Sequence, residues 1–157
     1  MSCDLRVERL MPGAPEVPLV ARWRHEAFFA EEGWSLQQGV ELLEGCLRKT
    51  EREIGFLARL AGRPAGTALL IERELEARHD VTPWLAGLYV EPWARRQGVG
   101  AALVASVEGS ARKAGFARLH LYTPNAEDFY ARLGWCVEER FLWDGEPFVL
   151  MVRDLQK

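Results

Sequence analysis

Two closely spaced glycines, Gly98 and Gly100, stand where a strand-like run gives way to a helical pattern. The run Trp84–Val90 is apolar and stops before Pro92, and from Gly98 onward apolar residues recur every four positions. Glycine lets the backbone approach a ligand closely, and a helix that begins there points unpaired N–H groups and its positive dipole end outward. Such a turn is suited to a phosphate group.

Arg95 and Arg96 precede this turn and could add charge-assisted hydrogen bonds to a pyrophosphate. Two common phosphate motifs are excluded. No Lys-Ser or Lys-Thr follows the glycines, and the third glycine of a dinucleotide fingerprint would fall at Leu103. From the residues alone, a purely structural turn with solvated arginines remains the alternative.

A family resemblance favours the phosphate site. The string Arg95-x-x-Gly98-x-Gly100, directly after residues 88–92, resembles the acyl-CoA signature of the GNAT superfamily of N-acetyltransferases. A second segment, Leu-His-Leu-Tyr-Thr at 119–123 followed by Phe-Tyr-Ala-Arg-Leu-Gly-Trp at 129–135, is similar to the family's second CoA segment. The expected order of elements fits the family over essentially the whole chain.

The resemblance implies acetyl-CoA as cosubstrate and no metal. In the family, the turn amides hold the CoA pyrophosphate, and the preceding strand pairs with the pantetheine arm. The residues that carry over are Leu88, Tyr89 and Val90 on the strand and Arg95, Arg96, Gln97, Gly98, Val99, Gly100 and Ala101 at the turn.

Acetyl transfer to an amine needs a base, because an alkyl amine with a pKa near ~10.4 is almost fully protonated at neutral pH. Glu72, His79, Asp80 and Glu91 lie near strand ends that flank Trp84–Val90. Spacing singles out none of them. The resemblance suggests that the segment before Trp84 leads to the reaction site, so we expect Asp80 or Glu72, with solvated strand-end charges as the alternative.

Tyr130 is the predicted general acid for the departing thiolate, since a phenol with a pKa of about 10 stays protonated at neutral pH. Its place in the second family segment supports this role. The alternative is that Phe129 and Tyr130 are both core aromatics. We expect the backbone N–H of Val90 to stabilise negative charge on the carbonyl oxygen, if the strand bulges there.

Covalent and metal-dependent routes have weaker support. The three cysteines, Cys3, Cys46 and Cys136, are far apart, and burial or disorder is expected for each. His25 and His120 have no partner at metal-ligand spacing and are expected to be structural or surface residues. Direct transfer in a ternary complex is therefore predicted.

These residues need a scaffold of alternating elements. Apolar periodicity predicts a first strand and then two amphipathic helices, of which the second is N-capped by Ser35. A series of further strands and helices follows. The series is strands Ile54–Leu60 and 65–71, strand Trp84–Val90, a helix from Gly98 to near Gly115, strand Arg118–Thr123, a helix over 125–133, and strands 136–142 and 148–152. This predicts an α/β (α+β) fold with a mixed sheet of about six to seven strands flanked by about four helices.

Composition fits this scaffold. The chain has 157 residues, 48% hydrophobic and 27% charged, and we expect one domain over 1–157. Its net charge of -3 gives no overall field for nucleic acid. Neither a signal peptide nor a transmembrane stretch is recognised, and the cysteine usage fits a reducing compartment, so a cytoplasmic protein without membrane contact is expected.

The predicted function is transfer of acetyl from acetyl-CoA to a primary amine of a small molecule or peptide. The alternative is a noncatalytic acyl-CoA-binding regulatory or interaction module with the same fold. A homodimer is a further expectation from the family. Phe29, Glu31, Glu32 and Trp34 lie where GNAT enzymes often form the acceptor wall, which hints at a cationic, partly apolar amine, with a solvated acidic loop as the alternative.

Overall fold

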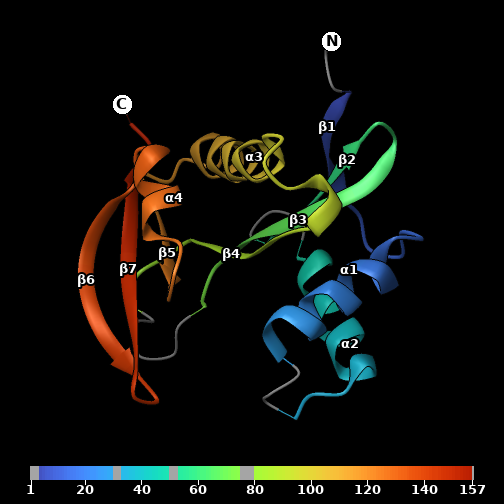
Figure 1. Cartoon of the computed structure of the whole chain (residues 1–157), viewed down its shortest axis with the longest axis horizontal. Coiled ribbons are helices and arrows are strands. Elements are labelled where there is room, and N and C mark those ends of the chain that lie inside the picture. Colours follow the sequence, from blue (N-terminus) through green and yellow to red (C-terminus); the bar gives the residue numbers. More distant parts are fainter. Residues whose placement is uncertain (1–3, 30–32, 50–52, 75–79, 157) are drawn as a thin grey trace.

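The computed structural model describes residues 4–29, 33–49, 53–74 and 80–156. Seven strands form one mixed sheet in the order β1-β2-β3-β4-β5-β7-β6 (Figure 1). Their bounds are β1 Leu5–Leu10, β2 Ile54–Leu60, β3 Arg63–Ile71, β4 Trp84–Val90, β5 Arg118–Thr123, β6 Cys136–Trp143 and β7 Glu146–Asp154. Only β4 and β5 pair in parallel among these neighbours, and the predicted fold class is confirmed.

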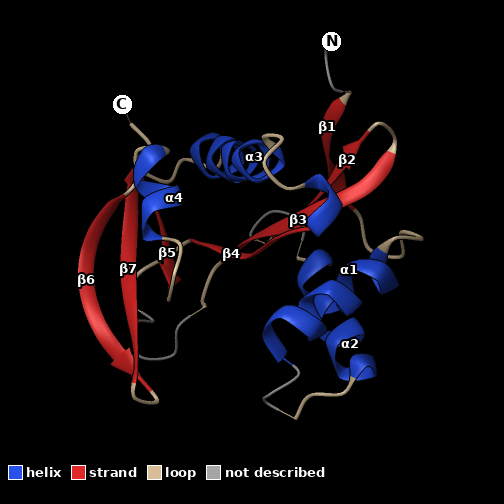
Figure 2. Cartoon of the chain, viewed as in Figure 1, coloured by secondary structure: helices blue, strands red, loops and turns tan. Residues whose placement is uncertain are grey.

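Helices cover both faces of the sheet (Figure 2). They are α1 Val17–Arg24, α2 Leu36–Leu47, α3 Val99–Lys113 and α4 Glu127–Arg132, with a π-helical turn η1 at His25–Phe29 and a 3-10 turn η4 at Pro92–Ala94. α3 packs on one face, where its buried residues share a core with β2, β4, β5 and β7. α1 and α2 pack on the other face, in a second core.

Local sequence explains where the helices begin and which face they bury. The Ser35 hydroxyl accepts a hydrogen bond from the Gln38 N–H at 3.1 Å, and the Gln38 side chain accepts one from the Ser35 N–H at 2.8 Å. This capping box confirms the predicted start of α2. In α3, the residues at four-residue spacing, Val99, Leu103 and Val107, are all buried, as the periodicity predicts.

The sheet is split between β4 and β5. Their register holds one pair, Trp84 with His120, and the His120 N–H donates to the Pro83 carbonyl at 3.1 Å. Beyond that pair the strands part, so within the described strands the rest of β4 has no register partner on β5. One edge of β4, with its backbone donors and acceptors, therefore faces the gap between β4 and β5, called here the opening.

The other edge of β4 carries a bulge. Tyr89 lies opposite Thr67, whereas Ala86 lies opposite Leu69, so β4 has one more residue than β3 over this stretch. The bulge therefore consists of Gly87 and Leu88, and the φ of Gly87 is 61°. The expectation of a bulge at Val90 is wrong, because Val90 pairs in register with Gly66.

The helical segment before η1 also differs from the prediction. The pattern of Val20, Trp23 and Ala27 suggests one continuous helix, but α1 ends at Arg24 and the chain continues as the π-turn. Such turns insert one residue into a helix and often mark functional sites. Among the described residues, no helix is long and apolar enough to cross a bilayer.

The shared core under α3 predicts a large loss of stability on truncation. Leu103 is fully buried between α3 and the sheet, and Leu103→Ala should lower the free energy of unfolding by roughly 2–5 kcal/mol through lost burial and a cavity. Leu142→Ala is the matched control, because Leu142 is 72% exposed on β6. Urea unfolding of both variants tests this, and equal stabilities would contradict the assignment of the core.

Candidate active site

The turn after β4 presents backbone donors to solution. Gly98 is the N-cap of α3 with φ 86° and ψ 3°, a left-handed conformation that glycine adopts without penalty. A Cβ on Gly98 would meet nothing within 4 Å, so the space in front of the turn is open. The N–H groups of Val99, Gly100 and Ala101 lie in the first turn of this 15-residue helix, where no intrahelical acceptor serves them. This geometry can hold a phosphate group.

Side chains around the turn fix its shape. Arg95 donates from Nε to the Val90 carbonyl at 2.8 Å, and Gln97 donates from Nε2 to the Trp93 carbonyl at 3.2 Å. Arg96 has a φ of 63°, a second left-handed residue in the same turn. Arg95 and Arg96 are exposed, so their guanidinium groups stand beside the open space and can meet an anion.

Gly100 has a different role from Gly98. A Cβ there would lie 3.2 Å from Cζ of Phe129, so the missing side chain allows α4 to pack against the first turn of α3. The two sequence segments that suggest a CoA site therefore meet in space at Gly100 and Phe129.

β4 leads from the opening to this turn. Leu88 and Val90 are half-buried and pack toward the core under α3, and Tyr89 faces the opposite side, where it lies 5.6 Å from Trp23 between ring centroids. Gly87 and Leu88 have no register partner on β3 or β5 among the described strands. The backbone groups outside the sheet register therefore lie at the bulge, two residues before the end of β4.

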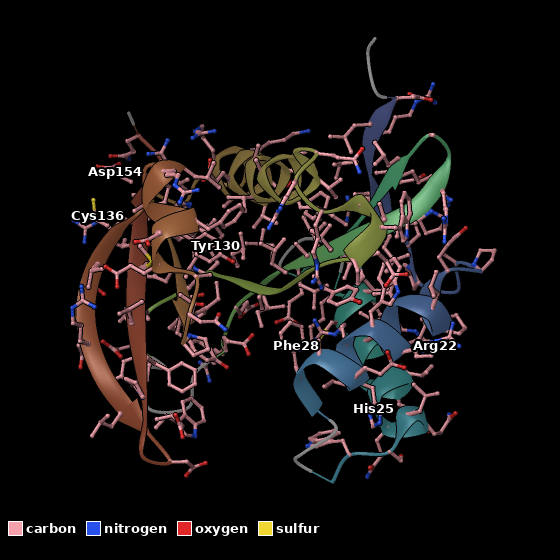
Figure 3. All side chains as sticks on the ribbon, in the orientation of Figure 1. Arg22, His25, Phe28, Tyr130, Cys136 and Asp154 are labelled. Carbon is pink, nitrogen blue, oxygen red and sulfur yellow. The ribbon has the colours of Figure 1, made fainter. Side chains whose placement is uncertain are left out.

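Tyr130 lies on the inner side of α4 (Figure 3). It is 6% exposed and its ring contacts Phe129 and Trp135 at centroid distances of 5.0 and 5.9 Å. Burial raises the pKa of its phenol well above the usual value. The hydroxyl is therefore protonated at neutral pH, and the same burial disfavours its phenolate form.

The acidic candidates lie at the end of β3 and just before β4. Glu72 is half-buried; its backbone N–H donates to Glu53 at 3.0 Å, and its carbonyl accepts from the Thr82 hydroxyl at 2.7 Å. Asp80 is exposed. Glu91 accepts a hydrogen bond from the Tyr89 hydroxyl at 2.9 Å, and burial together with this bond raises the pKa of Tyr89.

The structure adds three polar residues that sequence reasoning missed, namely Arg24, Glu74 and Tyr122. Arg24 from α1 is 9% exposed, and a Cβ on Gly87 would lie only 2.1 Å from its Nη1, so the guanidinium occupies the space that the bulge glycine leaves. Burial lowers the pKa of Arg24 and the Glu74 carboxylate opposes that shift. Glu74 in turn accepts a hydrogen bond from the Tyr122 hydroxyl at 3.4 Å.

No local motif marks this trio, since its members come from α1, the segment after β3, and β5. Arg24 looks like the last basic residue of an ordinary helix, and Tyr122 looks like any aromatic strand residue. A signal was present only at Gly87, because a glycine inside a strand pattern suggests a bulge or a close approach.

Other candidate nucleophiles and ligands do not assemble into a site. Burial raises the pKa of Cys46 to about 11, so its reactive thiolate is scarce at neutral pH. Cys136 is exposed, so its expected burial is wrong: it begins the edge strand β6. His120 is buried against Trp84, and no three metal-ligand side chains gather among the described residues.

Part of the predicted acceptor region is not described. Glu31 and Glu32 lie outside the described residues, as do His79 and Cys3. Trp34 follows that gap and is 37% exposed.

A pocket of about 350 Å³ lies away from the glycine turn. It lies between α4 and the β6–β7 hairpin, and its lining residues are Pro124, Glu127, Arg140, Phe141, Leu142, Pro147, Phe148 and Val149. At its rim Arg140 donates from both Nη atoms to the Glu127 carboxylate, at 2.9 and 3.0 Å. The glycine turn and Tyr130 do not contribute to its lining.

The chain is similar to known acetyltransferases. The model of the acetyltransferase (GNAT) family matches residues 17–135. An uncharacterized N-acetyltransferase from the hisH-hisA intergenic region of Azospirillum brasilense is 40% identical over 96 residues, which are 57% of this chain and 55% of that protein. The matched stretch therefore spans only about half of that relative.

Solved structures agree in fold. An aminoglycoside 6'-N-acetyltransferase complexed with coenzyme A superposes with a TM-score of 0.78 at 16% identity, over 97% of this chain and 98% of that one. The Salmonella typhimurium protein yncA, solved with its cofactor acetyl-CoA, gives a TM-score of 0.74 at 15% identity, over 98% and 95%. The resemblance seen in the sequence is confirmed, and the chain belongs to the GNAT family of acetyltransferases.

Proposed function

We propose that the protein is an acyl-CoA-dependent N-acetyltransferase that moves acetyl from acetyl-CoA to a primary amine of a small molecule or peptide. One observation carries the proposal: the open glycine turn at the start of α3 follows β4, which beyond Trp84 has no register partner on β5 among the described strands. Membership in the GNAT family supports the same reading.

The residues present fit acetyl-CoA. The amides of Val99, Gly100 and Ala101, with Arg95 and Arg96 beside them, would hold the pyrophosphate. The remaining turn residues, Gln97 and Gly98, shape the loop. The edge of β4 that faces β5, at Leu88, Tyr89 and Val90, would hydrogen-bond the amide-containing pantetheine arm, much as it would another strand, and the Val90 carbonyl has a second lone pair beside its bond from Arg95.

Bound acetyl-CoA supplies an activated thioester, so that a C–N bond to the amine forms while the C–S bond breaks. Tyr130 would hydrogen-bond the departing sulfur and donate its proton to it, and the phenolate so formed, which burial disfavours, would take a proton back from solvent. The bulge offers the backbone N–H of Leu88, rather than Val90, as donor to the carbonyl oxygen.

The amine must lose its proton before attack, and an acidic side chain near the parting of β4 and β5 would accept it. Asp80 and Glu72 stay the predicted bases. A single ordered water would connect either carboxylate to the amine if no direct contact forms.

Calorimetric titration with acetyl-CoA tests the donor. We expect a dissociation constant of roughly micromolar order for acetyl-CoA and no saturable binding of NAD or ATP, because the turn lacks both nucleotide fingerprints. Absence of acetyl-CoA binding to a folded sample would refute the proposed function.

Gly98→Ala tests the phosphate cradle. The new Cβ would project into the open space before the turn and would force a left-handed alanine, so acetyl-CoA affinity should fall by about tenfold or more. Gly109→Ala is the matched control, because Gly109 lies in the same helix with nothing within 4 Å of an added Cβ. The control should retain affinity, and equal affinities in the two variants would contradict the cradle.

Tyr130→Phe tests the acid. The ring contacts with Phe129 and Trp135 remain, so the fold and the dissociation constant of acetyl-CoA should be unchanged. Loss of the hydroxyl should lower kcat by roughly a hundredfold. In the parent protein the raised pKa of Tyr130 predicts that its ionisation causes no loss of activity up to about pH 10. An unchanged kcat in the variant would assign Tyr130 to the core alone.

A further inference from the structure

Four aromatic side chains line one face of the C-terminal half of the sheet, beside the split. They are Tyr122, Phe141, Trp143 and Phe148, called here the aromatic surface. Tyr122 and Phe141 pack with the core on the α1–α2 side of the sheet, opposite α3. The aromatic surface therefore faces away from the helix that begins at the glycine turn.

Tyr122 ties the aromatic surface to the reaction region. It stands two residues beyond His120, the last residue of β5 that pairs with β4. It lies on the part of β5 that has parted from β4, and its hydroxyl reaches Glu74 at 3.4 Å. The Glu74 carboxylate also stabilises the charged form of Arg24, whose guanidinium fills the space beside Gly87. One end of the aromatic surface is thus joined, through Glu74 and Arg24, to the β4 bulge.

The rings are stacked and partly exposed. Tyr122 and Trp143 lie 5.8 Å apart between centroids with planes 22° apart, and Phe141 and Phe148 lie 5.8 Å apart at 18°. Trp143 is 38% exposed at the hairpin end of β6. Exposed, pre-stacked rings suit a flat apolar group, since they lose little conformational freedom on binding.

The Glu74 carboxylate, at one end of the aromatic surface, favours a ligand that carries a positive charge at that end. A carboxylate accepts several hydrogen bonds, so Glu74 can accept from an ammonium group as well as from Tyr122. Aromatic faces attract a nearby cation further.

We infer that the acceptor is a primary amine that carries an aryl group, with the ring on the aromatic surface and the amino group at Glu74. This inference rests on the proposed function, because it names the acceptor class of the same enzyme. Glu74 binds the amine and orients it toward the β4 bulge, and Trp143 determines the preference for a flat ring.

The experiment compares 2-phenylethylamine with 2-cyclohexylethylamine and with an aminoglycoside, using thiol release from acetyl-CoA by the full chain. We expect kcat/KM to favour the phenyl amine over its saturated analogue by roughly three- to tenfold, the range of one aromatic contact. Trp143→Leu should bring this ratio close to one. Leu142→Ala is the matched control: Leu142 is the neighbouring residue on β6, is 72% exposed, and takes no part in the ring contacts of the aromatic surface.

Glu74→Gln is the second variant. It should raise KM for the phenyl amine by about tenfold, as expected for loss of a charge-assisted contact, while the dissociation constant of acetyl-CoA stays unchanged. Thermal unfolding shows whether each variant is folded, and the conservative glutamine keeps a hydrogen-bond acceptor for Tyr122.

The outcomes separate the two proposals. If acetyl-CoA binds but the phenyl amine has no advantage, or Trp143→Leu keeps the advantage, the aryl acceptor is refuted and the proposed function stands. If acetyl-CoA does not bind, or no amine turns over, calorimetric titration with 2-phenylethylamine tests the aryl-amine site without catalysis. Binding that Trp143→Leu removes and Leu142→Ala retains supports the aromatic surface as an aryl-amine site, and absence of binding to the parent protein refutes it.

Discussion

The parting of β4 from β5 after a single parallel pair is the constraint on which the rest of the molecule depends. A sheet that opens in its middle loses hydrogen bonds that would otherwise join its two halves. Packing replaces them: the core under α3 contains residues of β2 and β4 on one side of the split and of β5 and β7 on the other. Trp84, the residue of β4 that pairs with β5, is fully buried and joins the two halves of the sheet on the face opposite α3. Apolar contacts on both faces of the sheet therefore hold its two halves together.

Arg24 links α1 and the segment after β3 to the β4 bulge. A buried guanidinium is costly unless it is compensated, and here its charge is opposed by Glu74. The same guanidinium occupies the space of the missing Gly87 side chain, so any larger residue at 87 would displace it. The end of α1, the bulge of β4 and the segment after β3 thus depend on one another. A π-turn follows directly after Arg24, at His25–Phe29.

Most of the scaffold could be predicted because its signals are local. The four-residue spacing of Val99, Leu103 and Val107, and the Ser35 cap, report directly on short-range geometry. The bulge was misplaced, because a register shift depends on the partner strand and not on β4 alone. The exposure of Cys136 was likewise missed, since only the strand order makes β6 an edge. Sequence patterns report a residue's own element well and its neighbours across the sheet poorly.

The two halves of the candidate site differ in the same way. A phosphate cradle built from backbone amides needs glycine and a helix start within a few residues, so it leaves a readable motif at Gly98 and Gly100. A surface built from side chains of β5, β6 and β7 has no such requirement, and residues 122, 143 and 148 are aligned only by strand pairing. The proposed donor site is therefore visible in the sequence, whereas the proposed acceptor surface becomes visible only once the sheet is assembled. For the same reason, two chains that share the glycine motif and the fold can differ fully in the amine they accept.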